Sequence, residues 1–196
     1  MAENIDKTRL TTDLRYRFEY ISKFLDFSQT DITILNKLST IIQPLIPVIV
    51  DNVYRKLFSF DITKQYLLLR HTCLDNFLST DRYNLGFNSD AMEYRKNMLS
   101  KYLKCILTQH EWNESFLQYL SYVAKIHTDK IGSSLIHVDF IHIIALCGYL
   151  EQNLINIILQ SENLDNQTKH AGIMAINKVF WIQNDFFRMH YEYDLN

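Results

Sequence analysis

Turn-forming residues are scarce in this chain, which has four glycines and two prolines in 196 residues. An all-β fold needs tight turns between its strands, and glycine and proline form many of those turns. Apolar residues instead recur three and four positions apart in most segments, which is the spacing of one face of an α-helix. The sequence therefore predicts an all-α fold.

We expect the helices to be joined by polar segments. Pro44 and Pro47 interrupt one apolar stretch, and we start a helix there because proline fits the first turn of a helix. Residues 79–89 are rich in Asp, Asn and Gly, which predicts a loop. The predicted helices cover residues 12–27, 31–42, 44–58, 63–69, 90–108, 113–128, 138–160 and 166–191.

The length of the chain fits one domain, which is large enough to fold without disulfides. No repeat or boundary divides it, so we predict a single domain over residues 1–196, with the polar residues 1–11 flexible. Cys73, Cys105 and Cys147 are odd in number and far apart, which favours free thiols in a reducing compartment. The N-terminus lacks the apolar core of a secretory signal, so the cytoplasm is the expected location.

Several function classes are disfavoured. The formal net charge of −2 gives no basic footprint for nucleic acid. We identify no apolar run of transmembrane length, and so expect no membrane partner. The chain also lacks a phosphate-binding loop, a dinucleotide-binding glycine motif, an HExxH zinc motif and a nucleophile elbow. The sequence therefore gives no positive sign of an enzyme.

One histidine lies at the end of an apolar helical stripe. Phe116, Leu120, Val123, Ala124 and His127 share a helical face, which predicts that His127 points inward. One such histidine in an apolar pocket can hold a haem iron. On spacing alone, the alternative is favoured: a core histidine whose ring nitrogens bond to backbone carbonyls.

Tyr54 is the second candidate, because it shares a face with Val50, Val53 and Leu57. A buried tyrosine needs a partner for its hydroxyl, and that partner could be a ligand bound to haem. Taken alone, Tyr54 is better explained by a bond to a backbone carbonyl.

The predicted helix 138–160 is apolar on two faces. Such a helix is buried on both sides, either within the monomer or at a subunit interface. One stripe contains Ile141, Ile144, Ala145 and Gly148, and the other Phe140, Ile143, Cys147, Leu150 and Leu154.

Four strings, taken in order, make the chain resemble the protoglobins and the globin domains of globin-coupled sensors, especially the fungal members. They are VDNVYRKLF, AKIHTDKIG, HVDFIHIIALCGYLEQNLI and INKVFWIQNDFF. The resemblance covers about residues 31–191, and the helix at 12–27 corresponds to the additional N-terminal helix of these globins. It implies a globin-type helical sandwich.

The resemblance also implies a site. It makes His127 the proximal ligand of the iron of haem b and Tyr54 the distal residue. It further implies a homodimer through the last two long helices. Protoglobins often carry a bulky aromatic residue on the distal-side helix, where this chain has Met98 and Leu99, with Tyr102 one turn later. The other cofactor-contacting residues expected are Phe58, Met98, Leu99, Tyr102, Ile141 and Ile144.

The predicted function is reversible binding of a diatomic gas (dioxygen, carbon monoxide or nitric oxide) at a histidine-ligated iron, for sensing or redox chemistry. Two alternatives belong to other classes. One is a haem-free globin-fold interaction module in stress signalling. The other is an enzyme, such as a haem-based nitric oxide dioxygenase or a peroxidase.

Overall fold

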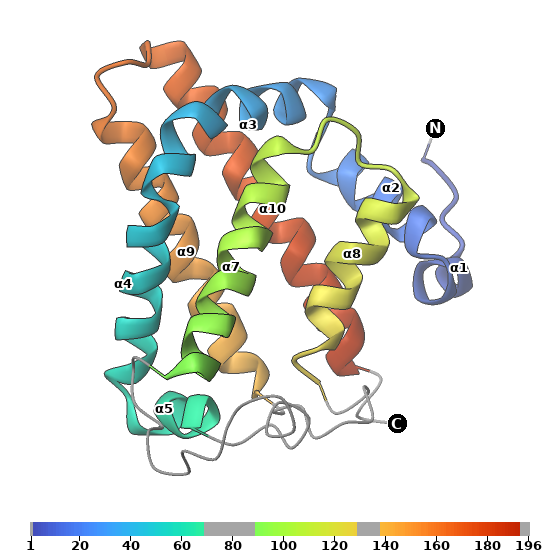
Figure 1. Cartoon of the computed structure of the whole chain (residues 1–196). Helices are drawn as coiled ribbons and strands as arrows, with labels where there is room; N and C mark the ends of the chain where they lie inside the picture. Colours follow the sequence, from blue (N-terminus) through green and yellow to red (C-terminus); the bar gives the residue numbers. More distant parts are fainter. Residues whose placement is uncertain (1, 69–88, 129–137, 193–196) are drawn as a thin grey trace.

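The structure, a computed structural model, describes residues 2–68, 89–128 and 138–192 (Figure 1). Those residues form helices and no strand, which confirms the predicted all-α class. The helices are α1 (Lys7–Thr12), α2 (Leu14–Phe24), α3 (Gln29–Ile42), α4 (Ile46–Phe58), α5 (Asp61–Leu68), α7 (Asp90–Thr108), α8 (Glu114–Lys125), α9 (Phe140–Gln160) and α10 (Asn166–Glu192). The predicted loop at 79–89 lies outside the described residues except for Ser89.

Local sequence explains where the helices begin. Pro44 lies in a 3₁₀ turn between α3 and α4, and Pro47 lies in the first turn of α4, where proline costs no hydrogen bond. Asn113 caps α8 by accepting a hydrogen bond from the backbone N–H of Phe116. Ser28 and Asp31 form a capping box at the start of α3.

The short helix α1 was not predicted. Asp6 caps it by accepting hydrogen bonds from the backbone N–H groups of Thr8 and Arg9. None of its residues is buried, so it has no apolar stripe from which periodicity could have detected it. The flexibility expected for residues 1–11 stays a prediction.

Helix α10 is the centre of the core. It packs against α9, α3 and α8, and it passes behind α7 and α8 in Figure 1. Helices α3 and α10 approach each other closely at Gly172, since a Cβ at this position would lie 2.8 Å from Cδ1 of Leu38. The side chains of Leu35 and Leu38 on α3 and of Phe186 on α10 are fully buried in the core. The core therefore joins the first and last thirds of the chain.

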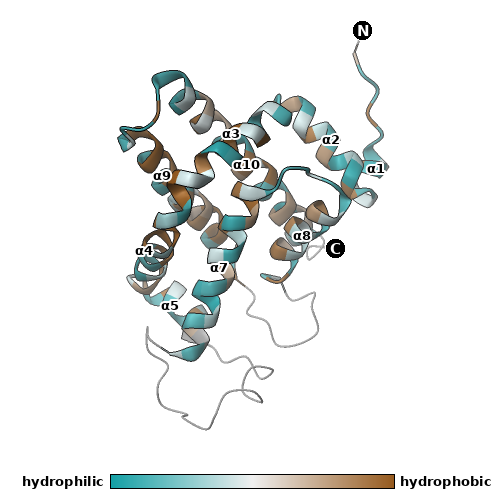
Figure 2. Cartoon of the chain, turned by 45° about the horizontal axis from the view of Figure 1, so that its top comes forward, coloured by the Kyte–Doolittle hydropathy of each residue, from teal (hydrophilic) through white to brown (hydrophobic). Residues whose placement is uncertain are grey.

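Two helical stretches are long and apolar enough to span a membrane by length and hydropathy alone. They are Gln29–Phe58, which includes α3 and α4, and Phe140–Gln160, which is α9. The expectation that no segment reaches this length is therefore wrong. Core helices of a soluble protein pass the same test, and both stretches contribute buried residues to the core. In Figure 2, α9 is hydrophobic over much of its length.

Candidate functional site

Helix α4 carries Tyr54 into the interior, as predicted from its helical face. Its side chain is buried, and among the described residues its hydroxyl has no hydrogen-bond partner. Burial raises the pKa of Tyr54 to about 12, against the opposing effect of the Arg95 cation. The phenol is therefore neutral and able to donate. A backbone carbonyl partner, the alternative considered from the sequence, is not observed.

His127 follows α8 in a turn, where its backbone N–H bonds to the carbonyl of Ala124 at 3.2 Å. Its Nδ1 lies 2.8 Å from the carbonyl oxygen of Val123. A carbonyl can only accept, so this contact places the ring proton on Nδ1 and leaves the lone pair of Nε2 available. Nε2 itself forms no hydrogen bond with the described residues. One ring nitrogen is thus oriented by the backbone, and the other can bind a metal.

The environment of His127 keeps its ring neutral. Burial lowers the pKa of His127, and the nearby Arg95 cation lowers it further, while the bond to Val123 acts in the opposite direction. The edge of the ring packs against Phe187 of α10, with ring centroids 5.5 Å apart. Neutral imidazole is the form that binds metals.

The backbone of His127 is also fixed. Its carbonyl oxygen accepts hydrogen bonds from the backbone N–H of Val138 at 3.2 Å and from the hydroxyl of Tyr191 at 3.0 Å. Tyr191 also donates to the carbonyl of Val138. The end of α10 therefore holds together the end of α8 and the start of α9.

Arg95 on α7 belongs to the same region, and the sequence analysis missed it. Its Nη1 donates to the carbonyl of Leu67 in α5 at 2.9 Å. Burial lowers the pKa of Arg95, and its charge acts on both Tyr54 and His127. An arginine within an amphipathic helix pattern is usually solvated, so sequence periodicity gave no reason to single it out.

Tyr102 lies two turns after Arg95 on α7, whereas Met98, between them, is exposed at 37%. Tyr102 is buried, and its hydroxyl has no hydrogen-bond partner among the described residues. Burial raises the pKa of Tyr102 well above its usual value, with smaller contributions from Cys147 and from Tyr119 of α8. Tyr102 therefore lies near Cys147 of α9 and Tyr119 of α8.

The remaining predicted contact residues divide into two groups. Phe58 and Leu99 are half-buried and pack against the core. Ile141 and Ile144 are exposed, at 71% and 48%, while Ile143 and Cys147 occupy the buried face of α9. Assigning Ile141 and Ile144 to pocket walls was therefore incorrect, because the other apolar stripe of this helix faces inward.

The other described histidines have different surroundings. His110 and His170 are exposed. His190 lies on α10 with Nε2 2.8 Å from the hydroxyl oxygen of Ser121, and the ring of His142 lies against Tyr66. No cluster of three or more His, Cys, Asp or Glu side chains that could hold a metal occurs among the described residues.

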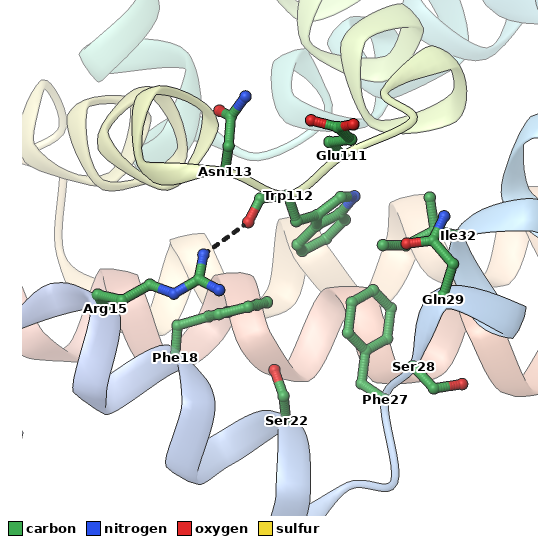
Figure 3. Close-up of a pocket in the computed structure, with 10 residues that line it drawn as sticks. All are labelled: Arg15, Phe18, Ser22, Phe27, Ser28, Gln29, Ile32, Glu111, Trp112 and Asn113. Carbon is green, nitrogen blue, oxygen red and sulfur yellow. Dashed lines mark hydrogen bonds between the residues drawn. The ribbon is translucent and has the colours of Figure 1, made fainter.

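A separate cleft of about 390 Å³ lies between α2, the start of α3 and the segment before α8 (Figure 3). The rings of Phe18, Phe27 and Trp112 pack against one another there, with centroids 4.7 to 6.3 Å apart. Arg15 donates to the backbone carbonyl of Trp112 at 3.0 Å. None of the predicted site residues lines this cleft. It lies where α2 packs against the start of α3 and the segment before α8.

Comparisons with known proteins give two findings. Residues 14–196 match the sequence model of the protoglobin family. Among solved structures, the chain is similar to the globin domain of a Geobacter sulfurreducens globin-coupled sensor, with a TM-score of 0.67. That similarity covers 88% of this chain and 96% of the other at 14% sequence identity, and so it shows the fold. A search of curated proteins gives no match.

Proposed function

The chain belongs to the protoglobin family, and from this premise we propose that it binds haem b and, through the haem iron, a diatomic gas. The proposal also places the protein in the cytoplasm. The single observation that carries the proposal is the hydrogen bond from Nδ1 of His127 to the carbonyl of Val123. It leaves Nε2 as a fixed, neutral metal ligand.

The chemistry of His127 and Tyr54 supports this cofactor. His127 would hold the iron, and the apolar side of α7 and Tyr54 of α4 would contact the opposite side of the porphyrin. Haem, when bound, would supply an iron that binds dioxygen, carbon monoxide or nitric oxide reversibly. The unpartnered hydroxyl of Tyr54 would donate a hydrogen bond there.

Haem occupancy is the direct test. Protein purified from haem-supplied cells is expected to show a strong Soret band and to contain haem near one per chain. Absorption spectroscopy and a pyridine haemochrome assay measure both quantities. A colourless protein that also rejects added hemin would contradict the proposal and would favour a haem-free globin-fold interaction module.

Tyr54→Phe is expected to speed dioxygen dissociation by about twofold to tenfold, because a net hydrogen bond contributes about 0.5–1.5 kcal/mol. Carbon monoxide is less polar when bound, so its dissociation rate should change little. Stopped-flow measurements of both rates check this. Tyr102→Phe is the comparison variant, since Tyr102 is also buried and its hydroxyl also has no hydrogen-bond partner among the described residues. Equal dioxygen rates in wild type and Tyr54→Phe would make Tyr54 a packing residue.

We further propose a homodimer formed through α9 and α10. Five exposed apolar side chains support this: Ile141, Ile144 and Leu159 on α9, and Met174 and Trp181 on α10. Glu151 accepts a hydrogen bond from Asn177 at 2.7 Å, which fixes the two helices side by side. Exposed apolar surface on adjacent helices is typical of a subunit interface.

A further inference from the structure

Arg95 is a partly buried cation without a carboxylate partner among the described residues. Within the described part of the chain, its hydrogen bond is donated to the backbone carbonyl of Leu67. Removing a cation from water is costly unless an anion or several hydrogen bonds compensate. A carbonyl carries only a partial charge and occupies only one of the guanidinium N–H groups.

Other buried cations of this protein are compensated. Arg17, Lys96 and Lys178 have side-chain exposures of 13%, 15% and 16%, and they pair with Asp185, Asp51 and Asp31 at 2.5, 3.1 and 3.0 Å. Each of these three therefore has a carboxylate. Arg95 lacks one, which indicates that its counter-ion comes from outside the described chain.

The position of Arg95 limits what this counter-ion can be. Its charge acts on both Tyr54 and His127, the two residues proposed to lie on opposite sides of the haem. Its contact with Leu67 places it where the start of α7 meets α5, at the lower end of the molecule in Figure 1. The end of α8 lies at the same end in Figure 1, and His127 follows α8 by two residues. An anion here would belong to the edge of a molecule that fills the site.

We infer that Arg95 is a carboxylate-binding residue, and that the site selects a porphyrin carrying free carboxylates over a neutral porphyrin of the same shape. This inference rests on the proposed function, because it assigns the carboxylates to a bound tetrapyrrole. The planar guanidinium can bind a carboxylate through two parallel hydrogen bonds. Arg95 thereby sets the orientation of the porphyrin as well as its affinity.

The test uses metal-free protoporphyrin IX and its dimethyl ester, titrated into the full-length apoprotein and followed by porphyrin fluorescence. Neither probe contains iron, so binding does not depend on ligation by His127. Arg95→Gln is expected to lower the affinity for protoporphyrin IX by about tenfold to a hundredfold, which is the range for a hydrogen bond to a charged group. The affinity for the dimethyl ester should change by less than about tenfold, because its ester carbonyls accept only a hydrogen bond to an uncharged group.

Two further variants separate charge from structure. Arg95→Lys retains the cation and should recover part of the affinity for protoporphyrin IX. Lys101→Gln removes an exposed cation from the same helix and should change neither affinity. Circular dichroism melting of each variant reports whether it folds.

The outcomes are distinct. If Arg95→Gln weakens the binding of protoporphyrin IX and of its dimethyl ester equally, or weakens neither, Arg95 does not bind a carboxylate. The inference is then overturned, while the haem proposal stands. If the wild-type protein binds neither porphyrin, the proposed function fails together with the inference. A loss of affinity for protoporphyrin IX but not for its dimethyl ester supports both the inference and the proposed function.

Discussion

Replacing His127 with alanine is expected to abolish normal iron ligation, the largest spectroscopic change that any single substitution should produce in this chain. The ferrous spectrum should lose its five-coordinate histidine character. Porphyrin can still occupy the mutant, because burial of its apolar surface does not need the bond to iron. Added imidazole should then enter the space left by the side chain and restore a histidine-like spectrum.

This result is specific to His127. Its Nδ1 is held by Val123 and its Nε2 is without a partner among the described residues, whereas His110 and His170 are exposed. His110→Ala and His170→Ala should therefore leave the spectrum unchanged, and we expect the same of His71→Ala, although His71 lies outside the described residues. An unchanged ferrous spectrum in His127→Ala would identify another residue as the ligand.

The sequence was sufficient for the all-helical fold and for the burial of Tyr54. Helical periodicity gave the correct bounds of α7, Asp90–Thr108, and placed Tyr54 on the buried face of α4. Apolar spacing works here because each helix buries one stripe against a common core. The site role of His127, in contrast, came from the resemblance to protoglobins, since spacing alone favoured a core histidine.

The errors have physical causes as well. Arg95 was missed because its interior position depends on how α7 sits against α5 and α8, and a single helix pattern does not contain that information. Ile141 and Ile144 were assigned inward because α9 has two apolar stripes, and periodicity alone cannot say which one meets the core. Tertiary packing decides both questions.

The exposed stripe of α9 leads to the second large effect. Ile141→Glu combined with Ile144→Glu is expected to convert the dimer into a monomer. A two-fold interface presents the same patch twice, so the double substitution would place four carboxylates in one interface. An uncompensated charge buried in an interface costs about 3–5 kcal/mol, so the dimer dissociation constant should rise at least about a hundredfold.

A single substitution in the same interface should have a smaller effect on the dimer dissociation constant. Trp181 is 58% exposed on α10, and a large aromatic residue at an interface contributes disproportionately to association. Trp181→Ala should therefore weaken the dimer by about 2 kcal/mol or more, roughly thirtyfold. Haem content should be unaffected in both variants, because these side chains face away from the buried side of their helices.

Sedimentation velocity over a range of protein concentrations measures these dissociation constants. Phe24→Glu is the matched control, because Phe24 is 77% exposed and lies on α2, away from the stripe. If Phe24→Glu also dissociated the dimer, a charge at any exposed apolar position would be sufficient, and the interface could no longer be assigned to α9 and α10. A wild-type protein that is monomeric at micromolar concentration would contradict the dimer outright, because an obligate interface of about 2,000 Å² should persist there. The outer stripe of α9 would then be an exposed apolar surface without a self-complementary partner.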